Sequence, residues 1–120
     1  GAPPSRVQDL DIRPESLPDD IGAAALRLLA EGGVREVLSL LYRGALSRAV
    51  HHHGIRIGAS FTEGEVLSAV RRDLDAHATT YFSDLIRAWR TTVYAGTALP
   101  AEVVRPLCER FAATLDTATP

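Results

Sequence analysis

The stretch VREVLSLLYRGALSRAVHHH, residues 34–53, decides the fold of this chain. Apolar residues recur along it at the i, i+3, i+4 and i+7 spacing of an amphipathic helix. Leu40, Gly44 and Ser47 form a second face of smaller residues on the other side. A helix with two such faces packs against neighbours on both sides. We therefore predict a central helix over residues 34–53, in which Gly44 allows a close approach of another element.

A capping pattern marks the start of the next helix. Thr62 can cap a helix, and Glu65, three residues later, can reach back to the Thr62 N–H. Phe61 precedes the cap and can pack on Val66 as a hydrophobic staple. Together these residues predict a helix that begins at Thr62 and buries Val66.

Two more helices are predicted on either side of this pair. Residues 20–31 begin with a candidate cap, Asp20, and end at the Gly32-Gly33 pair. After a polar break at about residues 75–79, a further helix runs to a glycine stop at Gly96.

The last predicted helix covers about residues 101–115. Pro106 lies inside this span and should kink the helix or delay its start, because proline lacks the N–H that the helix needs. Cys108 falls on the inward stripe of the same helix, where cysteine behaves as a small hydrophobic residue. We therefore do not assign Cys108 a catalytic role.

The first twenty residues contain four of the seven prolines and have no helical period. Steps from any residue into proline favour extended backbone. We predict an all-α fold: a compact bundle of about five helices over residues 20–116, preceded by an extended, proline-rich arm or linker over residues 1–19. Residues 117–120 are expected to form a disordered tail.

The three consecutive histidines are predicted to end the central helix. On a helix His51, His52 and His53 point in three different directions, so they do not converge on a metal ion. His77 lies far along the chain in the predicted polar break. Gly54 is expected to supply the left-handed cap. If any of these histidines contacts the helix end, where the helix dipole favours protonated histidine, we expect a modest loss of stabilising charge above about pH 7.

No catalytic pattern is present in the sequence. Glu63 and Glu65 are two residues apart on a helix and do not face each other. A nucleophile elbow, a phosphate-binding glycine loop and a Cys-x-x-Cys pair are all missing. The sequence therefore predicts a protein that is not an enzyme and uses no cofactor or metal.

Aromatic–arginine pairs near helix ends suit a protein interface. The candidate interaction residues are Tyr42, Arg43, Trp89, Arg90 and Tyr94. We predict that they contact a protein partner or a second copy of the chain. Each of them also fits the rim of the core, with its polar tip outward. The alternative function is a regulatory module that senses a small ligand in a pocket near Tyr42, Trp89 and Tyr94.

Nucleic-acid binding is a third candidate, because two of the helices follow each other as in a helix-turn-helix. The second of them would carry Glu63, Glu65 and Asp73 against Arg71 and Arg72, which makes it a poor reader of a polyanion. The net charge of the chain is −2. We therefore expect no nucleic-acid partner.

The composition indicates a bacterial source. All 13 basic residues are arginine, and lysine, asparagine and methionine are absent, as in proteins from GC-rich genomes. No apolar run approaches the roughly 20 residues of a membrane span, so we expect a soluble fragment.

Two stretches carry a family resemblance: LYRGALSRAVHHHGIRIGASFTEGEVL, residues 41–67, and YFSDLIRAWRTTVYAG, residues 81–96. They resemble the bacterial domain of unknown function 4129, the C-terminal domain of transglutaminase-like (protein-glutamine gamma-glutamyltransferase-like) membrane proteins. The likeness covers about residues 36–96. It implies a domain on the cytoplasmic face of the inner membrane, attached through transmembrane segments outside this sequence. No transglutaminase catalytic residue lies in it.

Overall fold

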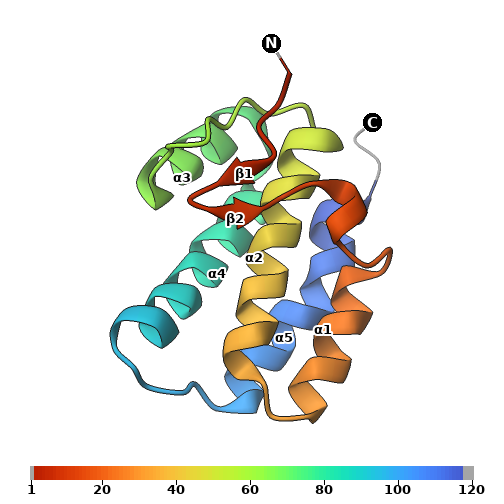
Figure 1. The fold of residues 1–120 in the computed structure, drawn as a ribbon, viewed down its shortest axis with the longest axis vertical. Coiled ribbons are helices and arrows are strands. Elements are labelled where there is room, and N and C mark those ends of the chain that lie inside the picture. The colour runs from red at the N-terminus through yellow and green to blue at the C-terminus, as the bar shows by residue number, and fades with distance from the viewer. Residues whose placement is uncertain (1, 118–120) are drawn as a thin grey trace.

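The computed structural model describes residues 2–117 of the chain, and helix α2 is the element around which this part packs (Figure 1). Its five α-helices are α1 (Ile21–Ala30), α2 (Val34–His51), α3 (Glu63–Asp73), α4 (Ala76–Tyr94) and α5 (Ala101–Phe111). Two short strands, β1 (Arg6–Val7) and β2 (Leu10–Asp11), precede them. The predicted all-α bundle is therefore confirmed, with a small antiparallel hairpin added.

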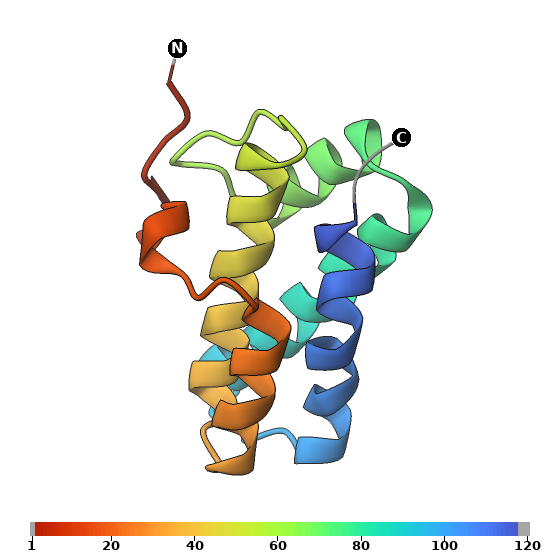
Figure 2. The ribbon, with the colours of Figure 1, turned by 90° about the vertical axis from the view of Figure 1, so that its right-hand side faces the viewer.

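Both faces of α2 are buried, as predicted. Helices α1 and α5 lie side by side against one of them, and α4 packs on another part of its surface (Figure 2). Gly44 makes the close approach to α1 and α5 possible. A Cβ atom at this position would lie 2.8 Å from Cδ1 of Ile21 and 3.2 Å from Cζ of Phe111. Glycine is therefore the residue that lets these three helices meet.

Side-chain caps fix where three of the helices begin. Asp20 accepts a hydrogen bond from the Ala23 N–H at the start of α1. The predicted capping box is present at α3: Thr62 Oγ1 accepts from the Glu65 N–H at 3.1 Å, and Glu65 Oε1 accepts from the Thr62 N–H at 3.0 Å. These contacts satisfy N–H groups that have no partner inside the helix.

The predicted polar break at residues 75–79 was wrong. Helix α4 begins at Ala76, because Asp75 Oδ1 accepts a hydrogen bond from the Ala78 N–H at 2.8 Å and so caps the helix. His77 therefore lies in the first turn of α4. An N-cap followed by a first turn of small and polar residues resembles a loop in the sequence.

The predicted glycine stops are confirmed. Gly54 and Gly96 have φ angles of +67° and +65°, the left-handed region that ends a helix. Helix α2 itself ends at His51, two residues earlier than predicted. Helix α5 starts at Ala101 and continues through Pro106, so its start is not delayed. It ends in a π-helical turn, η2 (Ala112–Asp116), that keeps Leu115 buried.

Residues 5–17 are folded onto the bundle. Of the two predicted alternatives, arm and linker, this segment is therefore an arm. Three of its apolar side chains, Val7, Ile12 and Leu17, belong to the hydrophobic core. Beyond the hairpin the chain forms a 3₁₀ turn, η1 (Pro14–Ser16). The domain therefore extends towards the N-terminus beyond the predicted boundary at residue 20. Residues 118–120 of the predicted tail lie outside the described part.

None of the helices within residues 2–117 is both long and apolar enough to cross a lipid bilayer.

Candidate functional site

Tyr42 is the buried support of the predicted interaction surface. Its side chain is fully buried in α2, and its ring lies 6.2 Å from the ring of Trp89, centroid to centroid. Its hydroxyl accepts a hydrogen bond from Gln8 Nε2 at 3.1 Å. Burial raises the pKa of Tyr42 far above its ordinary value. The prediction that Tyr42 contacts a partner is therefore corrected: it holds Trp89 in place from beneath.

Arg43 joins α2 to the N-terminal arm. Its Nε donates to the carbonyl oxygen of Asp11 at 2.9 Å, and its Nη2 donates to Ser16, at 3.2 Å to the carbonyl oxygen and 3.1 Å to Oγ. These bonds fix the guanidinium in one position while leaving part of it accessible. Arg43 thus has a structural role that the sequence did not reveal.

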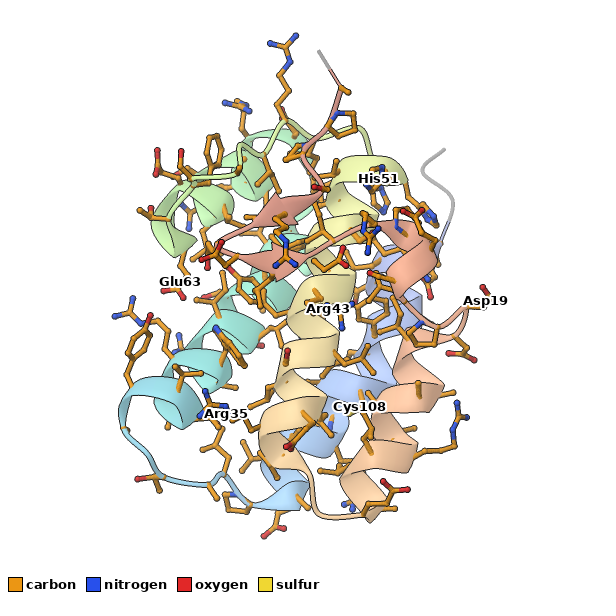
Figure 3. All side chains as sticks on the ribbon, viewed as in Figure 1. Asp19, Arg35, Arg43, His51, Glu63 and Cys108 are labelled. Atoms are coloured by element: carbon orange, nitrogen blue, oxygen red, sulfur yellow. The ribbon has the colours of Figure 1, made fainter. Side chains whose placement is uncertain are left out.

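Arg43 and Trp89 also line a shallow groove of about 510 Å³ beside the N-terminal half of α2. We call it the α2 groove. Its lining residues come from α1, α2 and α4: Leu28, Arg35, Glu36, Ser39, Leu40, Arg43 and Trp89. Figure 3 shows Arg43 beneath the hairpin and Arg35 lower on the same helix, towards α4.

Arg35 and Leu28 were missed by the sequence reading. Arg35 lies eight residues before Arg43, so the two side chains share one face of α2. That spacing was a signal available in the sequence. Leu28 lies on α1, and only the packing of α1 beside α2 brings it to the groove.

Arg90 and Tyr94 lie outside this groove, further along α4. Arg90 Nη1 is 3.5 Å from Glu63 Oε1, and its Cζ lies 5.9 Å from the centroid of the Tyr94 ring. Tyr94 is 73% exposed. The five predicted residues therefore separate into a buried support, a groove pair and an outer pair on α4.

The histidine stretch lies beside a polar contact that joins α2 to Asp19, just before α1, and to Asp116, at the end of η2. Arg48 Nε donates to Asp116 Oδ1 at 2.7 Å, and its Nη2 donates to the Asp19 carbonyl oxygen at 3.1 Å. His53 Nε2 lies 2.9 Å from the Leu115 carbonyl oxygen. Within residues 2–117 no three His, Cys, Asp or Glu side chains are grouped to hold a metal ion.

His52 does not gain the support for its protonated form that a helix end can give. Burial lowers its pKa, and the nearby Arg48 guanidinium lowers it further, although Asp116 opposes the change. Both leading causes disfavour the protonated ring. Folding therefore shifts His52 towards its neutral form.

Cys108 is 2% exposed on the inner side of α5. Burial raises the pKa of its thiol to about 11. A thiol with so high a pKa is almost entirely protonated near neutral pH, so it is a poor nucleophile. The packing interpretation made from the sequence agrees with this position.

The geometry does not favour a helix-turn-helix. That motif joins its helices by a turn of about 3–4 residues. Here residues 52–62 separate α2 from α3, and α3 packs mainly against α4.

Comparisons with models of protein families, with curated proteins and with solved structures found no match to this chain. The resemblance to the domain of unknown function 4129 therefore stays an expectation from the sequence.

Proposed function

We propose that this chain is a non-enzymatic protein-interaction domain whose α2 groove binds a partner protein. The observation that carries the proposal is the position of Trp89, which is half-buried, rests on the buried ring of Tyr42 and lies on the same groove as Arg35 and Arg43. Tryptophan and arginine are the residues most enriched where interfaces gain their binding energy. A supported tryptophan and a fixed arginine also lose little conformational freedom when a partner binds.

The charges of the groove favour a partner that presents carboxylates. Arg35 and Arg43 line it, and neither forms an ion pair with a carboxylate within residues 2–117. Glu36, the acidic residue of the groove, turns its side chain back towards the start of α2. Its Oε2 lies 3.0 Å from the position that a Cβ atom at Gly33 would occupy. Complementary charge of this kind sets the choice of partner and the rate of association.

The resemblance supplies the cellular context of the proposal. In it, the domain is the C-terminal part of a larger bacterial membrane protein, on the cytoplasmic face of the inner membrane. The groove would then recruit a cytoplasmic protein, or a second copy of the domain, to that membrane protein.

The test compares proteins captured from the lysate of the source organism by three forms of the chain. The groove variant carries Arg35→Glu and Ser39→Arg, which change the groove without entering the core. The control carries the matched changes Arg71→Glu and Ser68→Arg on the exposed side of α3. A protein retained by the wild type and the control but lost from the groove variant supports the proposal. The same set of bound proteins from all three forms contradicts it.

A small anionic ligand is the second candidate for this groove, since two arginines and an indole ring suit a carboxylate or phosphate attached to a flat ring. A thermal-shift screen against anionic metabolites separates the candidates. A saturable rise in melting temperature that Arg35→Glu abolishes favours the ligand over the protein partner.

A further inference from the structure

A second groove lies between α4 and α5, and α4 separates it from the α2 groove. Each helix contributes a stripe with the spacing i, i+3, i+4 and i+7. The stripe from α4 is Asp84, Arg87, Ala88 and Thr91, and the stripe from α5 is Val103, Pro106, Leu107 and Arg110. Leu99, from the loop that joins the helices, completes a groove of about 290 Å³. We call it the α4–α5 groove.

The two most exposed apolar side chains lie on the helices that form this groove. Within residues 2–117 the large apolar residues that stay exposed are Tyr94, at 73%, and Val103, at 50%. Val103 lines the groove directly. Tyr94 lies three residues after Thr91 and continues the same side of α4. Exposed apolar side chains gathered beside an apolar hollow mark a surface that a partner covers.

The charges beside the groove are unequal. Arg110 Nη1 is 3.0 Å from Asp84 Oδ2, and its Cζ lies 5.1 Å from the centroid of the Tyr81 ring, so this arginine is already held. Arg87 lies on the opposite wall and forms no ion pair within residues 2–117. One cation is therefore left over beside an apolar floor.

The structure assigns the α4–α5 groove to an amphipathic helix of a partner protein, one that carries aliphatic side chains on one face and a glutamate or aspartate opposite Arg87. Two neighbouring helices with such stripes form the surface into which a third helix packs its ridges. The volume suits one or two anchoring side chains, since whole small-molecule sites start at about 300 Å³. The unmatched charge of Arg87 selects an acidic over a basic helix.

This groove shares no lining residue with the α2 groove, so the two assignments stand or fall separately. If both hold, the domain contacts two different segments at once, one on each side of α4.

The experiment uses the 120-residue chain labelled with ¹⁵N and two synthetic helical peptides of about 15 residues. Both peptides carry leucines at i, i+4 and i+7; one is flanked by glutamates and the other by lysines. We expect the glutamate peptide to shift the amide signals of Thr91, Val103 and Leu107 saturably. Arg87→Glu should weaken its binding about tenfold or more and should improve binding of the lysine peptide. The matched charge reversal Arg71→Glu on α3 should change neither.

Three results would overturn the assignment. The first is that neither peptide shifts the signals of the groove residues, or that the shifts lie at the α2 groove. The second is equal affinity for both peptides in wild type and in Arg87→Glu. The third is a concentration-dependent dimer in sedimentation that Val103→Arg dissociates, because the occupant would then be a second copy of this chain. Val103→Arg changes an exposed side chain, so we expect the variant to fold. Its far-ultraviolet circular dichroism checks this independently.

Discussion

Gly44 shows how one missing atom sets the spacing of three helices. An added Cβ would lie 2.8 Å and 3.0 Å from Cδ1 and Cγ2 of Ile21 and 3.2 Å from Cζ of Phe111. Both side chains are in the core and have little room to move. The sequence predicted a close approach at Gly44, but it did not identify these two contacts.

We expect Gly44→Ala to destabilise the protein. Alanine gains up to about 1 kcal/mol in helix propensity, but crowding in a packed core costs about 1–3 kcal/mol. The net loss of unfolding free energy should be about 1 kcal/mol in urea denaturation, and adding Ile21→Val, which removes Cδ1, should restore part of it. Gly64→Ala is the control, since its nearest neighbour would be 3.9 Å away. A gain in stability at both glycines would contradict this prediction, because it would mean that the core side chains move enough to accommodate the added Cβ.

His52 gives a second prediction at the scale of one residue. Its pKa in the folded protein is lowered from 6.5, so the unfolded chain binds the proton more strongly. The stability it contributes is therefore complete above about pH 6.5 and is lost as the pH falls below that value. We expect the wild type to melt at a lower temperature at about pH 5.5 than at about pH 7.5, and His52→Gln to show a smaller difference.

The control for that experiment is His77→Gln, which replaces an exposed histidine on α4 and should keep the wild-type difference. An identical pH dependence in wild type and His52→Gln would remove His52 as its source. Asp11 does not interfere with this measurement, because its hydrogen bonds with Arg13 lower the pKa of its carboxyl group and so move its titration to far lower pH.

The positions of helix ends could be predicted best from the sequence, and the start of α3 is the clearest case. The capping box depends on residues three apart in the chain, so local sequence is enough to specify it. The start of α4 was misjudged for the opposite reason. Asp75 caps a helix whose first turn, residues 76–79, contains only small or polar side chains, and such a turn has no apolar stripe that would mark it as helical.

Thr62→Ala tests how much the capping box stabilises α3. Removing the hydroxyl leaves the Glu65 N–H without its acceptor, which should cost about 1 kcal/mol of unfolding free energy. Urea denaturation followed by circular dichroism measures this loss. Thr80→Ala, at an exposed position inside α4, is the matched control and should be neutral or slightly stabilising. Equal effects at the two threonines would mean that the cap adds nothing.

The N-terminal arm could not be assigned from local sequence, because its contacts are far away in the chain. Its strands have only two residues each, and Gln8 and Asp9 between them have positive φ angles. The arm is held by the core contact of Ile12 and by the hydrogen bonds from Arg43, both distant in sequence. Proline content indicated extended backbone correctly but gave no sign that the segment was docked.

Ile12→Ala tests whether the arm is an integral part of the domain. Ile12 is completely buried, so its truncation should cost about 2–5 kcal/mol of unfolding free energy. Leu10→Ala, on the half-buried neighbour in β2, should cost clearly less. The midpoint of urea denaturation gives both values. Unchanged stability in Ile12→Ala would return residues 1–19 to the status of a linker.

At the scale of the whole molecule, the sequence predicted the class of fold but not the grooves. Helical periodicity reports which side of a helix is buried, and this was enough to identify α2 as the central helix. A groove depends on which helices become neighbours. Leu28 reaches the α2 groove only because α1 packs on α2, and Val103 reaches Arg87 only because α5 turns back beside α4.

Cys108 allows the cooperativity of the whole molecule to be measured. Its thiol is 2% exposed and has a pKa raised to about 11, so a thiol reagent should modify it very slowly in the native protein. Helix α5 packs against α1, α2 and α4, and we expect it to open only when the entire bundle unfolds. The free energy of opening obtained from the labelling rate should therefore fall with urea concentration with the same slope as the free energy of global unfolding.

A variant with Cys108→Ala and Ala113→Cys provides the comparison, because position 113 is exposed and should label rapidly without urea. If Cys108 labels almost as fast in native buffer, α5 separates from the bundle by local opening. The α4–α5 groove would then be transient, since one of its two walls would leave with α5. If Cys108 instead labels slowly, with the urea dependence of global unfolding, both walls of the groove persist for as long as the protein is folded. A preformed docking surface requires this.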